Sequence, residues 1–124
     1  MGLSRIVMRL ARNPGTEFAN GDDHRGYMLI APLTSDGYLD EDAYARGRAG
    51  CTVRRFAPDE DAADGRLARR GGRWFFDYDE ADDADDEVVY RLGDHRFAVG
   101  EYVTVNDEDG RPLTYKVMEV APAA

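Results

Sequence analysis

Residues 102–120 read YVTVNDEDGRPLTYKVMEV, two runs of alternating apolar and polar residues separated by an acidic turn that ends in glycine. Such a period of two is typical of β-strands that bury one face. A three-residue turn over 108–110 sets Val105 opposite Leu113. It also sets Val103 opposite Tyr115, and it places Gly110 where a left-handed bulge residue is needed. We therefore predict a hairpin whose apolar side chains face the core. The opposite face then carries Tyr102, Thr104 and Lys116.

A second hairpin is predicted over residues 65–78, where Gly71 and Gly72 supply the positive φ angles of a two-residue turn. This register sets Arg69 across from Trp74, close enough for the guanidinium group to stack on the indole ring. One face of the hairpin gathers Leu67, Trp74, Phe76 and Tyr78. We expect this face to join the core, with Trp74 buried.

Further strands are predicted over 3–11, 27–31, 51–54 and 88–92, and turn signals recur about every ten residues. The best helix signal lies near 40–47, where Asp40 is a suitable N-cap and Gly47 a suitable stop. Seven or eight short strands with one short helix predict a mainly β fold. Two architectures remain open, a small antiparallel barrel and a compact sandwich.

The chain of 124 residues has a formal net charge of -9, and this charge is unevenly spread. The length predicts a single domain over residues 1–124. Carboxylates crowd the middle of the chain, and we expect residues 79–87 to form a mobile, solvated loop because like charges repel and little is buried.

Composition also bears on compartment and on partners. The acidic balance excludes a broad basic surface for duplex nucleic acid or for an anionic membrane. No apolar run approaches the roughly 20 residues that a membrane-spanning helix needs. Cys51 is the single cysteine, which favours a reducing compartment. We therefore expect a cytoplasmic protein, and the sequence carries no signal for a particular oligomeric state.

Several short motifs carry a resemblance: GY at 26–27, APL at 31–33, DGYLD at 36–40, GDHRF at 93–97, GEYV at 100–103 and DEDG at 107–110. Together they resemble a family of small uncharacterised bacterial proteins, and this resemblance implies no activity and no catalytic residue. The pattern FAVGEYVTV at 97–105 is also similar to a strand pair of SH3-like barrels, which are mainly binding modules.

The candidate binding site lies on the second predicted hairpin and the strand before it. Arginine and aromatic side chains are enriched where proteins recognise one another. The residues that we single out are Arg54, Arg69, Arg73 and Trp74. They predict a non-catalytic binding domain for a protein or a peptide. Single-stranded nucleic acid could use the same hairpin, over 66–76, but the net charge disfavours such a partner.

A small hydrolase-like enzyme using His24 or His95 is the alternative function. Nucleophilic catalysis would need Cys51 beside a base, and its place in an apolar alternation is instead typical of a small buried residue. Asp22 and Asp23 beside His24 could supply metal ligands, but a polar turn explains them better. The sequence has no recognisable cofactor motif, so we expect neither a cofactor nor a resident metal.

Overall fold

The computed structural model describes residues 2–47, 50–70, 73–78, 87–89, 95–106 and 110–123, with the backbone alone at 70 and 87–89. In chain order the elements are β1 (Ser4–Leu10), β2 (Asp22–Ala31), α1 (Glu41–Gly47), β3 (Thr52–Ala57), β4 (Glu60–Arg70), β5 (Arg73–Asp77), β6 (Glu87–Val89), β7 (Tyr102–Asn106) and β8 (Pro112–Pro122).

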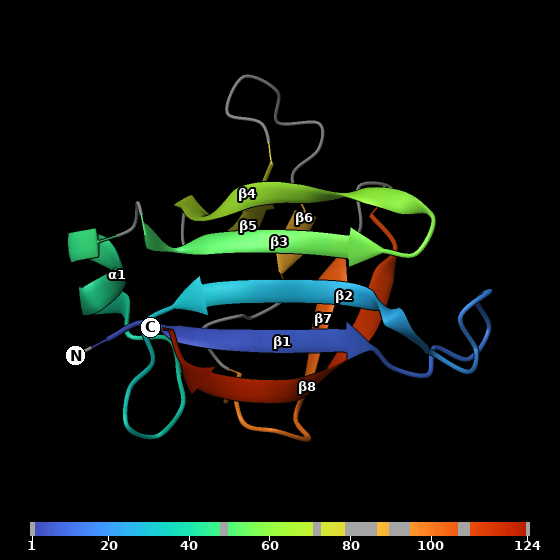
Figure 1. Cartoon of the computed structure of the whole chain (residues 1–124), viewed down its shortest axis with the longest axis horizontal. Coiled ribbons are helices and arrows are strands. Elements are labelled where there is room, and N and C mark those ends of the chain that lie inside the picture. Colours follow the sequence, from blue (N-terminus) through green and yellow to red (C-terminus); the bar gives the residue numbers. More distant parts are fainter. Residues whose placement is uncertain are drawn as a thin grey trace.

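The strands form a closed antiparallel barrel in which each strand pairs with the next along the chain (Figure 1). β8 closes the circle by pairing with β1, where Arg9 lies opposite Lys116. Of the two predicted architectures, the barrel is therefore the one that the chain adopts. Closure leaves no long unpaired edge at β1 or β8, which is how small sheets avoid edge-to-edge association.

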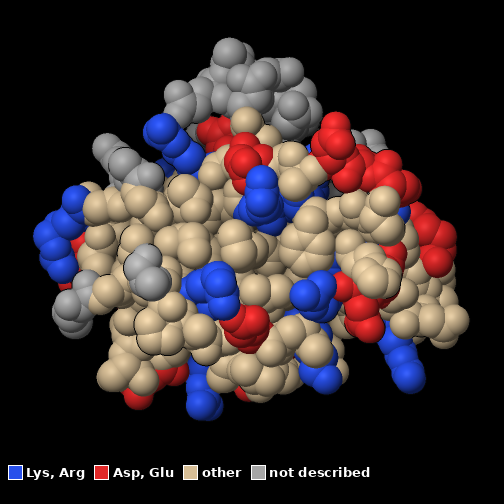
Figure 2. All heavy atoms as spheres, in the orientation of Figure 1, with Lys and Arg blue, Asp and Glu red and all other residues tan. Residues whose placement is uncertain are grey.

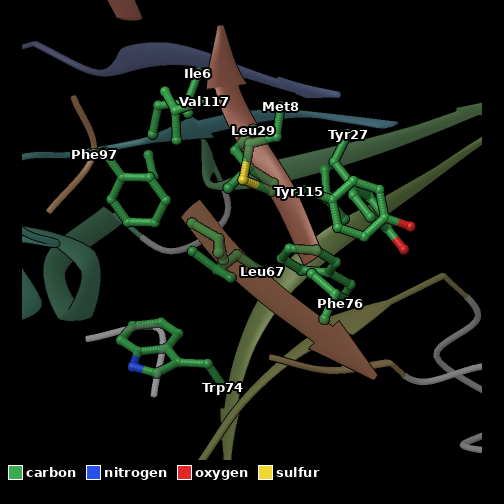
Figure 3. Packing of buried hydrophobic residues seen from close by; sticks show 14 of the residues in the cluster. Ile6, Met8, Tyr27, Leu29, Leu67, Trp74, Phe76, Phe97, Tyr115 and Val117 are labelled. Carbon is green, nitrogen blue, oxygen red and sulfur yellow. The ribbon is translucent and has the colours of Figure 1, made fainter. Parts of the chain in front are cut away.

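The interior of the barrel is filled with side chains, as expected for eight strands. Alternate residues of each strand point inward, and Ile6, Met8 and Leu10 of β1 are all buried, as their spacing predicted. Tyr27 packs against Phe76 and against Tyr115, with ring centroids 4.9 Å apart in both pairs (Figure 3).

Both predicted hairpin registers are confirmed. In the last hairpin Val105 pairs with Leu113 and Val103 with Tyr115, while Tyr102 pairs with Lys116 on the outer face. In the β4–β5 hairpin, Leu67 pairs with Phe76, Arg69 with Trp74 and Arg70 with Arg73, as predicted. The apolar alternation fixed these registers because a shift of one residue would turn each buried side chain to solvent.

The predicted helix is α1, and it lies beside one end of the barrel (Figure 1). Asp40 caps it as expected, because its Oδ1 accepts a hydrogen bond of 3.0 Å from the Ala43 amide. Tyr44 is buried, and its hydroxyl donates to the Leu67 carbonyl oxygen at 3.0 Å. The helix is therefore fixed to the barrel by both packing and a hydrogen bond.

Two strands begin earlier than the sequence predicted. Residues 22–25 belong to β2 rather than to a polar turn, because Asp22 pairs with Leu10 of β1 beyond a bulge that contains residues 23–25. β4 begins at Glu60 rather than near residue 65, and its first residues pair with β3. Neither extension shows apolar alternation in the sequence, because these residues are mostly polar and exposed and the strands there are held by backbone pairing.

Other predictions lie partly or wholly outside the described residues. The mobile acidic loop predicted over residues 79–87 lies outside the described residues from 79 to 86. The strand predicted over 88–92 is described only as β6, which ends at Val89. No helix in the described part of the chain is both long and apolar enough to cross a membrane.

Candidate functional site

Arg69 and Trp74 lie together where α1 meets the barrel. Trp74 is only 4% exposed, which confirms its predicted burial, and its ring meets that of Tyr44 edge-on at 4.9 Å. The Arg69 guanidinium lies 5.5 Å from the indole centroid and forms an ion pair of 2.9 Å with Glu41 of α1. Trp74 and Arg69 therefore make their aromatic and ionic contacts with other residues of this chain.

The other two residues of the predicted site lie on different surfaces. Arg54 is exposed on β3 and forms an ion pair of 2.9 Å with Asp64, its direct neighbour on β4. Asp64 is five residues from Arg69 along β4, which corresponds to about 16 Å of extended chain. Arg73 is exposed at the start of β5. The structure thus brings Arg69 and Trp74 together, but it does not join all four residues in one site.

The residues of the alternative enzyme are dispersed as well. His24 is exposed near the start of β2, where its backbone amide donates to Asp22 at 2.9 Å. Cys51 lies in the core beside the far end of β2, about seven residues or 23 Å along that strand from His24. Burial raises the pKa of the Cys51 thiol, which disfavours the nucleophilic thiolate. His95 is partly buried in the segment that precedes β7.

Metal ligands do not gather within the described ranges. No three side chains among the His, Cys, Asp and Glu residues of those ranges come together as a possible metal site. Asp22 instead accepts the His24 amide and lies 3.2 Å from Arg25. These contacts account for the polar start of β2 without a bound cation.

A cleft of about 620 Å³ lies on the outer face of the barrel, where β1 meets β8. Its lining comes from residues 9–12, from Asn20, Gly21 and Asp23, and from Tyr102, Lys116 and Met118. We call this feature the basic cleft, because Arg9, Arg12 and Lys116 line it against one carboxylate, Asp23.

Strand pairing places the side chains of the basic cleft. Lys116 of β8 lies between Tyr102 of β7 and Arg9 of β1, and all three point away from the core. The pairing with β1 shifts by one residue at Met118, which is therefore a bulge residue and is 46% exposed. Met118 points outward as the alternation of buried Leu113, Tyr115 and Val117 requires. The bulge turns Glu119 outward as well, at a position that strict alternation would bury.

Arg12 is held by an unusual connection between the end of β1 and β8. The side chain of Asn13, 8% exposed, donates to the carbonyl oxygens of Ala11 and Thr114 at 2.8 and 3.1 Å and accepts from the Thr114 amide at 2.8 Å. The amide group thus continues the strand pairing in place of backbone. The backbone around Arg12 is fixed, while its side chain is exposed.

On the described surface, the three cations of the basic cleft lack the carboxylate partners that several other arginines have. Five arginines outside the cleft have carboxylate partners, in the pairs of Arg5 with Glu119, Arg25 with Asp59, Arg54 with Asp64, Arg69 with Glu41 and Arg111 with Glu17. The exposed side chains of Arg46, Arg73 and Arg96 form no ion pair with a described residue, but they do not line the cleft. Within the described residues, Arg9, Arg12 and Lys116 form no such ion pair. Arg9 instead donates to the Asp23 carbonyl oxygen at 2.6 Å and lies 5.4 Å from the Phe56 ring centroid.

Figure 2 shows how charged side chains are distributed on one face of the molecule. Acidic side chains gather at the right of the view, by the turn between β3 and β4, and basic side chains continue along its lower edge. The protein as a whole has a net charge of -9, so a cleft with three cations and one carboxylate differs in sign from its surroundings. Such a difference attracts anionic groups to the cleft.

The sequence analysis missed the basic cleft because its residues come from three separate segments. One signal was present: the predicted register of the last hairpin already placed Tyr102 and Lys116 on the outer face, as the structure confirms. The pairing of β8 with β1, which adds Arg9, follows from barrel closure and has no local signal.

Comparisons with known proteins give no relative from which a function could be transferred. No protein-family model matches the chain, and no curated protein or solved structure matches it significantly. Functional reasoning therefore depends on the geometry of the cleft.

Proposed function

We propose that this protein is a non-catalytic binding domain that recognises an acidic segment of a partner polypeptide in the basic cleft. The observation that carries the proposal is the set of three cations, Arg9, Arg12 and Lys116, which share one concave surface without a carboxylate partner among the described residues. Unpaired cations in a partly enclosed site gain more from a bound carboxylate than fully solvated ones.

The apolar members of the cleft favour a polypeptide over a simple anion. Tyr102 is 54% exposed and lies across from Lys116, and Met118 is exposed beside them. Tyrosine and methionine are enriched at protein interfaces, where they contribute contact area without requiring a fixed partner geometry. A peptide supplies both carboxylates and carbon-rich side chains, so it fits this combination.

The packed interior supports the same proposal. Tyr27, Phe76 and Tyr115 meet inside the barrel, so the space that could hold a small ligand in an eight-stranded barrel is occupied by side chains. The outer wall is therefore where we place recognition. The proposal also places the protein in the cytoplasm, because Cys51 is a free thiol, as a reducing compartment favours.

The test is binding of a fluorescent octapeptide of glutamate, measured by anisotropy at low and at physiological salt. We expect binding that weakens as salt rises, since exposed charges are screened. Arg12→Glu should weaken it about tenfold, because the reversal replaces attraction by repulsion inside the cleft. Arg46→Glu, an exposed reversal in the last turn of α1, is the matched control and should have little effect.

Two results would contradict the proposal. One is equal loss of binding in the Arg46→Glu control, which would show a response to net charge alone. The other is tighter binding of an oligothymidylate octamer than of the peptide, which would assign the cleft to single-stranded nucleic acid.

A further inference from the structure

An exposed apolar surface adjoins the basic cleft. It consists of Val99, Tyr102 and Met118, which are 66%, 54% and 46% exposed, and we call it the apolar strip. Single exposed apolar residues are common on soluble proteins, but contiguous ones mark contact surfaces.

Backbone hydrogen bonds establish that the strip is contiguous. The Gly100 amide donates to the Val117 carbonyl oxygen at 2.9 Å, and the Val117 amide donates to the Glu101 carbonyl oxygen at 2.8 Å. The turn that carries Val99 is therefore fixed beside Met118. Tyr102 and Met118 also line the same cleft.

Val99 is held rigidly at the outside of its turn. The Glu101 amide donates to the Ala98 carbonyl oxygen at 3.0 Å, and Gly100 has a φ of 98°, which together define a β-turn of type II. Val99 occupies the first central position of this turn, where a polar residue would serve the turn equally well. A rigid, exposed valine costs little conformational entropy when a partner covers it.

We infer that the partner segment is bipartite, with a large apolar side chain that contacts the apolar strip and carboxylates that contact the basic cleft. This inference rests on the proposed function and adds the chemistry of the second contact. Charge complementarity identifies the acidic half, and the continuity of the strip with the cleft through Tyr102 identifies the apolar half.

The strands also set the spacing between the two halves. Met118 and Thr114 are four residues apart on β8, which corresponds to about 13 Å of extended chain. Ala11, the residue before Arg12, donates its amide to the Thr114 carbonyl oxygen at 3.0 Å. An extended partner therefore needs about three or four residues between its apolar side chain and the carboxylate that reaches Arg12.

The test compares two synthetic peptides on the full chain. Both carry three glutamates, and one adds leucine and phenylalanine three residues away where the other has serines. We expect the apolar peptide to bind about tenfold more tightly. Val99→Ser should remove most of this gain and leave binding of the serine peptide unchanged, because Val99 does not line the basic cleft.

The control is Met28→Ser, another change of an apolar side chain to serine, on the outer face of β2 in a smaller groove beside Arg54. It should retain the full gain. Equal affinity of the two peptides, with the serine peptide still bound, would overturn the inference and leave the proposed function standing. Failure of both peptides to bind would overturn the proposed function itself. Self-association that Met118→Ser abolishes would also overturn the inference, by assigning the strip to a second copy.

Discussion

Two cation–aromatic pairs, each formed across two adjacent strands of the barrel, differ in how far the aromatic ring is buried. Arg69 and Trp74 lie opposite each other on β4 and β5, as Lys116 and Tyr102 do on β8 and β7. Trp74 is 4% exposed and covered by α1, and Arg69 has a carboxylate partner in Glu41. Tyr102 is 54% exposed, and Lys116 has no ion pair among the described residues.

Residue type and strand register therefore do not decide whether a cation–aromatic pair is covered within the molecule or left exposed. What distinguishes the two pairs is whether another element of the chain covers the aromatic ring and neutralises the cation. At the α1 end both conditions are met internally, so the contacts stabilise the fold. At the basic cleft neither is met, so the same residue types remain available to a partner.

The largest expected effect is on stability, from truncating the two aromatic side chains. Trp74→Ala should lower the free energy of unfolding by about 3–5 kcal/mol, because it leaves a cavity beneath α1. Tyr102→Ala should change it by no more than about 0.5 kcal/mol, as is usual for exposed sites. Urea denaturation of the two variants measures both values, and a folded Trp74→Ala protein of near-native stability would reverse the assignment of the two pairs.

A smaller effect on stability tests how α1 is held over Trp74. Tyr44→Phe keeps the ring that packs on Trp74 but removes the hydrogen bond of 3.0 Å to the Leu67 carbonyl oxygen. We expect a loss of about 1 kcal/mol in unfolding free energy, with peptide binding at the basic cleft unchanged. Weaker binding in this variant would show that the two regions are coupled.

The smallest effect concerns the exposed ion pair of Arg111 with Glu17. This pair lies beside a third cation–aromatic contact, in which Arg25 and Arg111 lie 4.9 and 5.8 Å from the Phe18 ring centroid. Hydrogen bonding from Arg111 lowers the pKa of Glu17 below 4.5, so the folded state favours its ionised form. The associated stability is therefore present above pH 4.5 and is lost as the pH falls through the lowered pKa.

Urea denaturation of the native protein and of Glu17→Gln between pH 3 and pH 6 tests this dependence. The native protein should be slightly more stable near pH 6, and the difference should disappear toward pH 3. Because Glu17 and Arg111 are both exposed, added salt should reduce the difference. A difference that grows as the pH falls would contradict the assigned direction.

Local sequence predicted most of the barrel wall. Alternation along residues 102–120 specified the last hairpin to the residue, and the Gly71–Gly72 pair specified the register that sets Arg69 opposite Trp74. Asp40 and Gly47 marked the helix. These features were predictable because each depends on residues close together in the chain.

The site was less predictable, because it depends on contacts between distant segments. Arg9 meets Lys116 only because β8 closes the barrel on β1. Asn13 replaces backbone pairing at Thr114, and the bulge at Met118 turns Glu119 outward against the alternation. Counting arginines near aromatic residues favoured the 66–76 hairpin, and that count could not register that α1 covers Trp74.

The most direct test of the central claim is to map where an acidic peptide contacts the protein. We propose titrating the uniformly ¹⁵N-labelled chain with the glutamate octapeptide and following its amide signals. Recognition in the basic cleft predicts saturable shifts at Arg9, Arg12 and Lys116, with the signals of Arg69 and Trp74 unchanged. Shifts confined to the 66–76 hairpin, including the Trp74 indole N–H, would contradict the account.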